Sequence, residues 1–165
     1  MNDGYFKGWR FTTIGMYLAA FVTLVDQGTK MWVHNTIAQP PRLIEISPYL
    51  NLTLVWNRGV TFGLFDIKYE YMPYVFISIA LVIVLFLINW MMRANSLAIT
   101  IGLGMVMGGA VGNIIDRVRY GAVIDFIDAH WGEYHWYVFN IADSAVVCGV
   151  IILLIENVTK DLRRR

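Results

Sequence analysis

Four long apolar runs constrain the fold of this chain more than any other feature of its sequence. A helix needs about 20 mostly apolar residues to cross the hydrocarbon core of a membrane. Hydrophobic residues make up 58% of the 165 residues and charged residues 15%, against about 25% charged in soluble domains. The sequence therefore predicts an all-α membrane protein of one domain, residues 1–165, with four transmembrane helices at residues 11–33, 71–92, 97–115 and 138–158.

Basic residues in the short connecting segments predict the orientation of these spans. They cluster before the first span, between the second and third, and after the fourth: Lys7, Arg10, Arg93, Lys160 and Arg163 to Arg165. Four spans place all three segments on one side, and short loops rich in Lys and Arg face the cytoplasm. Both termini are therefore expected in the cytoplasm, and residues 35–70 and 117–137 outside.

The two outer segments carry different patterns. The stretch "NLTLVW" alternates in polarity and follows a turn signal at Ser47-Pro48, so a small extracytoplasmic β element is expected at residues 42–66. The second segment, "DFIDAHWGEYHWYVF", mixes aromatic and charged residues. It predicts an extracytoplasmic loop or a short interfacial helix.

Polar residues of three spans converge at one predicted depth. A rise of about 1.5 Å per residue puts Asp26, Asn113 and Asp143 each roughly 23 to 24 Å from the cytoplasmic end of its span. Ionisable residues inside a membrane are costly and mark functional sites by default. A purely structural alternative is that Lys30 and Arg117 reach the outer headgroups and pair with the acids.

The spacing of these residues indicates what they can do. Asp26 and Lys30 are four positions apart and can pair on one helix face. Asn113 shares a face with Arg117, and Asn140 shares one with Asp143. Two carboxylates that meet share a proton, so one can activate a water molecule while the other donates a proton to a peptide carbonyl. Spacing alone leaves several acids as candidates for the pair: Asp125, Asp143, Asp116, Asp128 and Asp26.

Other chemistry finds little support in the sequence. A net charge of +1 gives no nucleic-acid footprint, and a single cysteine gives no Cys-rich metal site. His130 and His135 lack a metal-binding spacing, so neither a metal nor a cofactor is expected. A small proton- or ion-coupled transporter using the Asp, Asn and Arg cluster remains the alternative function. It would need polar residues through the whole membrane depth.

Five motifs occur in order along the chain: "DQGTK", "WNRGVTF", "GGAVGNIIDR", "GAVIDF" and "FNIADS". Together they resemble the lipoprotein signal peptidase (signal peptidase II) family of bacterial membrane aspartic peptidases, over nearly the whole chain from Asp26. The resemblance implies an inner-membrane enzyme with its active site at the outer face. It also implies prolipoprotein substrates whose cysteine already carries diacylglycerol, contact with membrane lipid, and no need for a cofactor. A four-span site on one chain suggests that a monomer suffices.

The same resemblance implies roles for individual residues. Asp125 and Asp143 match the catalytic pair of the family. Substrate-binding or positioning roles fall to Asn57, Gly59, Asn113, Arg117 and Asn140, and a structural shell to Asp26, Lys30 and Asp116. Thr61 departs mildly from the small Ala or Ser that is usual after the "N-x-G" of the second motif.

Overall fold

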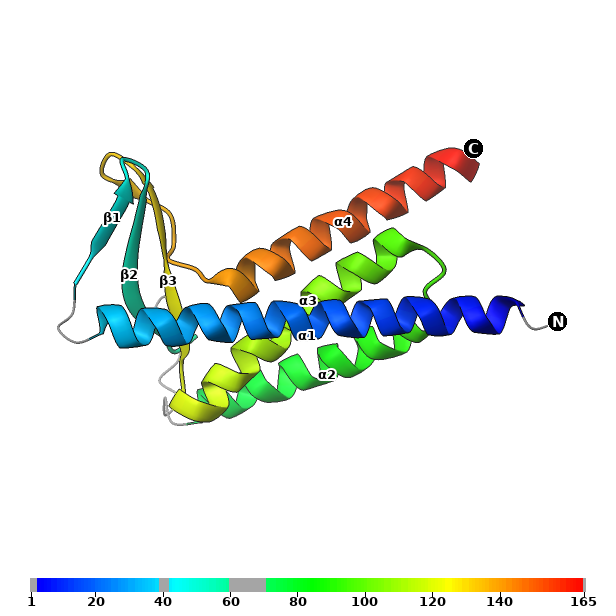
Figure 1. The fold of residues 1–165 in the computed structure, drawn as a ribbon, viewed down its shortest axis with the longest axis horizontal. Helices are drawn as coiled ribbons and strands as arrows, with labels where there is room; N and C mark the ends of the chain where they lie inside the picture. The colour runs from blue at the N-terminus through cyan, green and yellow to red at the C-terminus, as the bar shows by residue number, and fades with distance from the viewer. Residues whose placement is uncertain (1–2, 39–41, 60–70, 165) are drawn as a thin grey trace.

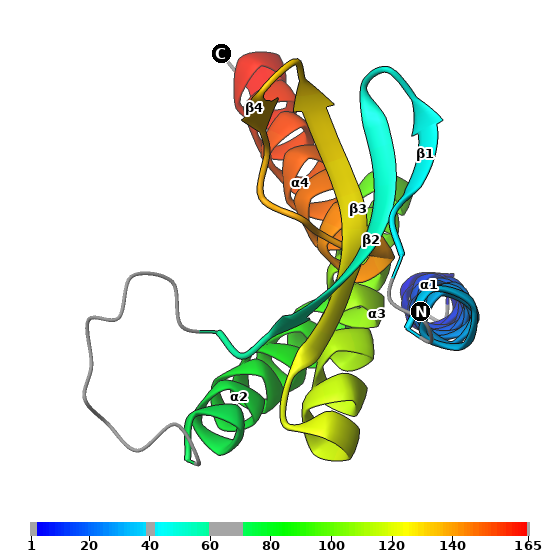
Figure 2. The same ribbon diagram turned by 90° about the vertical axis from the view of Figure 1, so that its left-hand side faces the viewer.

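A computed structural model describes residues 3–38, 42–59 and 71–164. Four helices run alongside one another, and a small sheet lies across one end of them (Figures 1 and 2). The elements are, in chain order, α1 (Asp3–Ile37), β1 (Ile44–Ser47), β2 (Leu50–Asn57), α2 (Met72–Met92), α3 (Leu97–Tyr120), β3 (Val123–Trp131), β4 (Tyr134–His135) and α4 (Ile141–Arg164).

Three helices in the described part of the chain are long and apolar enough to cross a membrane: Met72–Met92, Leu97–Tyr120 and Ile141–Arg163. Their outward faces are apolar, as in Val82 (67% exposed) and Leu154 (60% exposed). Such large apolar surfaces are stable against lipid rather than water. The chain is therefore a multi-pass membrane protein. α1 is longer, at 35 residues, and carries the buried Asp26 and Lys30 in its C-terminal half.

α3 is the central helix and packs most extensively against α1 and α4. Its small residues allow this close approach, as expected where helices associate without a hydrophobic driving force. A Cβ atom at Gly108 would lie 2.6 Å from the carbonyl oxygen of Ala19 on α1. A Cβ atom at Gly109 would collide with the carbonyl oxygen of Ala142 on α4. The adjacent glycines therefore allow α3 to pack closely against both α1 and α4.

The sheet is antiparallel in the order β1-β2-β3-β4, with α2 and α3 inserted between β2 and β3. The β structure predicted within residues 42–66 is present as β1 and β2, and residues 60–66 lie outside the described residues. The second outer segment was predicted as a loop or short helix, which is wrong, because Val123–Trp131 forms strand β3. Alternation explains the strand: Ile124 and Phe126 pack against Val33 and Ile37 of α1, while Asp125 between them faces the other way.

Several helix boundaries differ from the predicted spans. α1 covers Asp3–Ile37 where residues 11–33 were predicted, α3 runs to Tyr120 where the prediction ended at residue 115, and α4 spans Ile141–Arg164 where residues 138–158 were predicted.

α3 continues to Tyr120. In this last part Asp116, only 1% exposed, pairs with Lys30, Arg117 donates to the carbonyl oxygen of Asn113, and Arg119 is exposed. The helix ends where Gly121 adopts a left-handed conformation, φ 67°, and donates its backbone N–H to the carbonyl of Arg117. α4 begins at Ile141, so Asn140 precedes the helix instead of lying within it.

The packing of α3 predicts opposite outcomes for two glycine substitutions. Gly109→Ala forces α3 away from the α4 backbone, so overpacking should cost about 1–3 kcal/mol of stability despite the better helix propensity of alanine. Gly28→Ala should be neutral or stabilising by up to about 1 kcal/mol, because a Cβ atom at Gly28 meets nothing within 4 Å. Thermal unfolding in detergent measures both variants, and a Gly109→Ala variant as stable as Gly28→Ala would contradict the packing described.

Candidate active site

A buried lysine lies at the centre of the polar cluster. The Nζ atom of Lys30 is 2.9 Å from Oδ2 of Asp26, 2.8 Å from Oδ2 of Asp116 and 2.9 Å from Oδ1 of Asn113. An ammonium group has three N–H donors, so each donor has one acceptor. Lys30 is 2% exposed and the two acids are at most 1% exposed. The i,i+4 pair predicted for Asp26 and Lys30 is therefore present, within a larger buried network.

Each partner of Lys30 also holds a second part of the chain. Asp26 accepts a hydrogen bond from the backbone N–H of Ala142 (2.9 Å), the residue before Asp143. Asp116 accepts one from the backbone N–H of Ile124 (3.1 Å), the residue before Asp125.

Asn113 completes the set, because its Nδ2 atom donates to Oδ1 of Asp143 (2.8 Å). Lys30 thus fixes the segments of both Asp125 and Asp143.

Asn140 and Asp143 form a reciprocal cap at the start of α4. The Asp143 backbone N–H donates to Oδ1 of Asn140 (2.9 Å), and the Asn140 backbone N–H donates to Oδ2 of Asp143 (3.2 Å). This is the geometry of a capping box, with Asn and Asp in place of the usual Ser or Thr and Glu. The cap fixes the Asp143 carboxylate at a helix N-terminus, where the helix dipole favours negative charge.

Asn140 also holds Asp125. Its Nδ2 atom donates to Oδ1 of Asp125 (2.7 Å), and Nδ2 of Asn57 donates to Oδ2 of the same carboxylate (2.9 Å). Backbone hydrogen bonds between Phe139 and Ile127 keep the segment before α4 beside β3. One residue, Asn140, therefore contacts both Asp125 and Asp143 and brings the two acids to one place.

The environment of Asp125 alters its acidity. Asp125 is 2% exposed. Burial is the main cause that raises its pKa, to about 6, and the neighbouring negative charge of Asp143 adds to the effect. Hydrogen bonds from Asn57 and Asn140 oppose the rise in pKa. Asp125 is thus poised to hold a proton at a pH where an ordinary aspartate has lost it.

The other candidate acids have different partners. Asp26 and Asp116 are bound to Lys30. Asp128 lies further along β3, where it accepts a hydrogen bond from Asn51 (3.3 Å) and contacts Nδ1 of His135 (2.8 Å). Asp125 and Asp143 instead share a neutral hydrogen-bond partner, Asn140, and neither of them pairs with Lys30.

Arg117 and Gly59 meet at an aromatic ring that sequence reasoning missed. The guanidinium carbon of Arg117 lies 5.1 Å from the centroid of the Phe76 ring, within cation–π range. Arg117 also donates to the carbonyl oxygen of Asn113 (3.3 Å).

A Cβ atom at Gly59, whose φ is 79°, would collide with the same ring. The Gly59 backbone N–H donates to Oδ1 of Asn57 (2.8 Å), which leaves Nδ2 of Asn57 to face Asp125. Phe76 lies in a uniformly apolar span, so no local signal marks it.

Gln27 is a second residue that sequence reasoning missed. Its Nε2 atom donates to Oδ1 of Asp116 (2.8 Å) and to the carbonyl oxygen of Gly112 (3.1 Å). It therefore satisfies the Asp116 oxygen that Lys30 does not contact. Its place in "DQGTK", next to Asp26, was the available signal.

Within residues 3–38, 42–59 and 71–164, no group of three or more His, Cys, Asp or Glu side chains is arranged to hold a metal ion.

The fold and site define a multi-pass membrane protein whose polar centre lies beneath a small sheet at one end of its helices. The profile of the signal peptidase (SPase) II family matches residues 18–159. The chain therefore belongs to the signal peptidase II family, and it is a membrane protease.

Named relatives and solved structures agree with this assignment. Lipoprotein signal peptidases of Methylobacterium sp. (strain 4-46) and Methylorubrum extorquens (strain PA1) are each 41% identical to the chain, over 91% and 85% of its length and 92% and 83% of theirs. A bacterial membrane enzyme solved by the in meso method at 2.3 Å resolution matches with a TM-score of 0.76 and 30% identity, covering 92% of this chain and 91% of that one. A second, solved at 1.9 Å, matches with a TM-score of 0.75 and 33% identity, covering 86% and 90%.

The Lys30 network predicts a large stability loss when the cation is removed. Lys30→Met leaves Asp26 and Asp116 buried without their counter-charge, which should cost about 3–5 kcal/mol. Lys160→Met is the matched control, because Lys160 is 36% exposed and pairs with Glu156 at 3.2 Å; it should change stability by less than about 1 kcal/mol. Equal unfolding temperatures for the two variants would contradict the central role of Lys30.

Proposed function

We propose that the chain removes signal peptides from prolipoproteins whose cysteine carries diacylglycerol, as an aspartic endopeptidase that uses Asp125 and Asp143 as its catalytic pair. The observation that carries the proposal is the shared contact of Asn140 with both carboxylates. Membership of the signal peptidase II family supports the substrate class, because the named relatives are lipoprotein signal peptidases.

The proposed reaction needs one protonated and one ionised carboxyl group. Asp125 starts protonated, which its raised pKa supports, and Asp143 starts ionised in the first turn of α4. Asp143 takes a proton from a water molecule as the water oxygen attacks the scissile carbonyl carbon. Asp125 gives its proton to the carbonyl oxygen. Collapse of the resulting diol breaks the C–N bond. Asp125 takes back a proton from a diol hydroxyl, and the leaving nitrogen takes the proton that Asp143 acquired.

The remaining polar residues position this chemistry. Lys30, Asp26 and Asp116 form the supporting shell described above. Asn113 and Asn140 orient the carboxylates. Asn57 and Arg117 are proposed to bind the substrate backbone, with Gly59 holding Asn57 in place. All of these groups come from one chain, so a monomer suffices.

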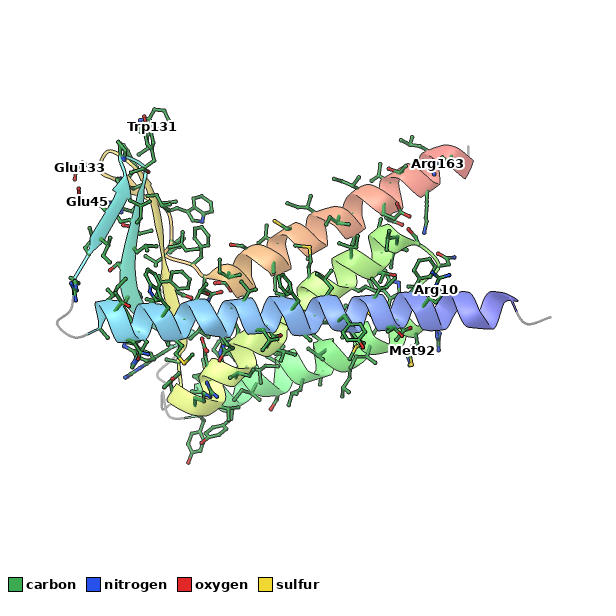
Figure 3. All side chains as sticks on the ribbon, in the orientation of Figure 1. Arg10, Glu45, Met92, Trp131, Glu133 and Arg163 are labelled. Carbon is green, nitrogen blue, oxygen red and sulfur yellow. The ribbon has the colours of Figure 1, made fainter. Side chains whose placement is uncertain are left out.

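We also propose that α1 is a fourth span and that the sheet faces the outside of the bacterial inner membrane. Arg10 and Arg163 lie at the end of the helices away from the sheet, whereas Glu45 and Glu133 lie at the sheet end (Figure 3). Basic residues at the cytoplasmic end follow the positive-inside rule. A lipid-anchored substrate then presents its cysteine to the pair at the outer headgroup level.

The transporter alternative is set aside, because the family to which the chain belongs is a peptidase family. The position of the polar cluster agrees with this conclusion. Apart from Thr100, the buried polar residues in the described part of the chain lie on strands β2 and β3 or in the hydrogen-bond network that joins α1 and α3 to β3 and to the start of α4.

Replacing either member of the pair tests the catalytic assignment. Asp125→Asn and Asp143→Asn should each lower kcat for a lipid-modified prolipoprotein by at least about a thousandfold, because each removes one proton-transfer group. Asp128→Asn is the matched control, since Asp128 lies on the same strand as Asp125 and should retain activity within about tenfold. If a folded Asp125→Asn or Asp143→Asn variant cleaves at the wild-type rate, the assignment is overturned.

The pH dependence of cleavage tests the protonation states. The proton on Asp125 is lost as pH rises through its pKa of about 6, so kcat/KM of the wild type should fall with a midpoint near that value. The hydrogen bond from Asn57 lowers the pKa of Asp125. Asn57→Leu should therefore move the midpoint to higher pH, whatever it does to KM. A midpoint that stays in place or moves to lower pH would exclude Asp125 as the proton donor.

A further inference from the structure

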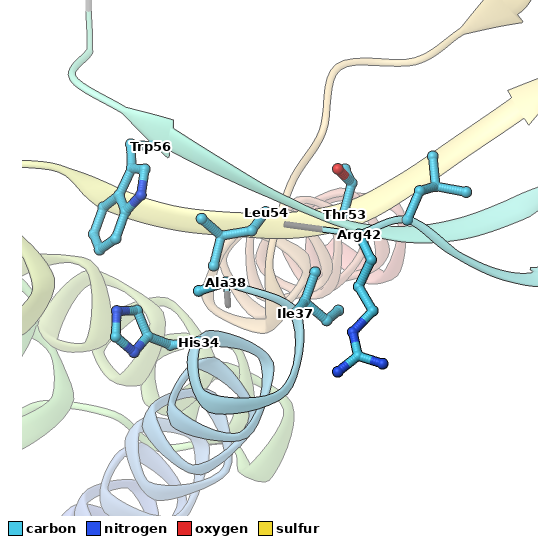
Figure 4. A pocket seen from close by; sticks show the side chains of 8 residues that line it. His34, Ile37, Ala38, Arg42, Thr53, Leu54 and Trp56 are labelled. Carbon is cyan, nitrogen blue, oxygen red and sulfur yellow. The ribbon is translucent and has the colours of Figure 1, made fainter. Parts of the chain in front are cut away.

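Two hollows flank Trp56 on the α1 side of the sheet. The larger, of about 630 Å³, lies between the end of α1 and β2. Figure 4 shows His34 and Trp56 at one end and Arg42 at the other, with Ile37 and Leu54 between them. The smaller, of about 280 Å³, is lined by Trp56, Arg58, Tyr120 and Ala122. We call these two hollows together the basic groove.

The charges of the basic groove are of one sign. Arg42 lies in one hollow and Arg58 in the other, and no carboxylate lines either among the described residues. None of the ion pairs between described residues involves Arg42 or Arg58. Guanidinium groups match the geometry of phosphate oxygens, whereas the walls between them are apolar or aromatic. This combination suits a ligand with an anionic head and an apolar body.

The position of the groove identifies the source of such a ligand. His34 follows Met31 and Trp32 on α1, which are 63% and 52% exposed and continue the apolar outer surface of the protein. Tryptophan favours the boundary between hydrocarbon and headgroups. The groove therefore opens at headgroup depth, where phospholipid phosphates are the abundant anions.

The groove is separate from the catalytic pair but connected to it through β2. Ile124 and Phe126 face α1, and Asp125 faces the other way. Trp56 immediately precedes Asn57, whose Nδ2 atom donates to Asp125. Trp56 is also held in ring contact with Tyr120 (5.3 Å between centroids) and His34 (5.8 Å). A ligand packed against Trp56 would brace the strand that carries Asn57 without occupying the substrate's place.

We propose that the basic groove binds an anionic phospholipid of the surrounding bilayer. Its phosphate lies at Arg42 and its glycerol and upper acyl chains lie against Ile37, Leu54 and Trp56, while Arg58 in the second hollow adds positive charge beyond Trp56. The bound lipid supports the alignment of Asn57 with Asp125. Binding is independent of the proposed peptidase function, and only the effect on cleavage rests on it.

Binding is tested on the full-length chain in detergent by titration with phosphatidylglycerol or phosphatidylcholine of identical acyl chains, with bound lipid counted by native mass spectrometry. Wild type should prefer phosphatidylglycerol by about tenfold or more, and Arg42→Gln combined with Arg58→Gln should remove that preference. Arg119→Gln is the matched control, because Arg119 is exposed, precedes Tyr120 at the end of α3 and lines neither hollow. This variant should keep the preference for phosphatidylglycerol.

Three binding results would overturn the proposal: an unchanged preference in the double variant, equal affinity of wild type for both lipids, or full displacement of the lipid by inorganic phosphate at matched concentration. The last would identify a soluble anion as the ligand.

Cleavage assays in nanodiscs distinguish a bilayer lipid from the substrate itself. The KM of the double variant should exceed that of the wild type in nanodiscs that contain phosphatidylglycerol. In pure phosphatidylcholine the two KM values should be equal. An equal rise in both membranes would place the substrate in the groove and overturn the proposal. Absence of any cleavage by wild type would contradict the peptidase function while leaving the binding result in force.

Discussion

The three hydrogen bonds of the Lys30 ammonium are the interaction on which the rest of the site depends. They join α1 to α3 through Asp116 and Asn113. Asp116 also holds the backbone beside Asp125, and Asp26, the third acceptor, holds the backbone beside Asp143. A buried ammonium is tolerated only when paired and hydrogen-bonded. The need of this one ammonium group for hydrogen-bond acceptors therefore sets the position of strand β3 relative to helix α4.

Burial and the balance of charge together raise the pKa of Asp125 above that of an ordinary aspartate. Four carboxylates, of Asp26, Asp116, Asp125 and Asp143, gather around two cations, Lys30 and Arg117. Lys30 is committed to Asp26 and Asp116. Arg117 remains near Asp125 and Asp143 but also lies over Phe76. Neutral donors from Asn57, Asn113 and Asn140 supply the other contacts of the pair. Burial then favours keeping one proton on the pair, at Asp125, over leaving both acids ionised.

Much of this arrangement could be predicted from the sequence, and the limits have physical causes. Apolar length predicted α2, α3 and α4 because membrane thickness fixes helix length, and helix rise predicted that Asp26, Asn113 and Asp143 share a level. Strand β3 was missed because its pattern becomes clear only once α1 covers Ile124 and Phe126. Phe76 and the central position of Lys30 depend on contacts between distant segments, which spacing within one helix cannot reveal. Spacing likewise could not decide whether Asp125 or Asp116 is the partner of Asp143. The family resemblance and the tertiary contacts of each acid favour Asp125.

Infrared spectroscopy of the protonated carboxyl group tests the central claim most directly, because it detects the retained proton without substrate. At about pH 5 an ordinary aspartate is ionised. The account predicts that the wild type shows a carboxylic-acid carbonyl band at this pH, that the band titrates with a midpoint near the Asp125 pKa of about 6, and that Asp125→Asn abolishes it. A band that persists in folded Asp125→Asn, or its absence from the wild type at about pH 5, would contradict the claim that this pair retains a proton on Asp125.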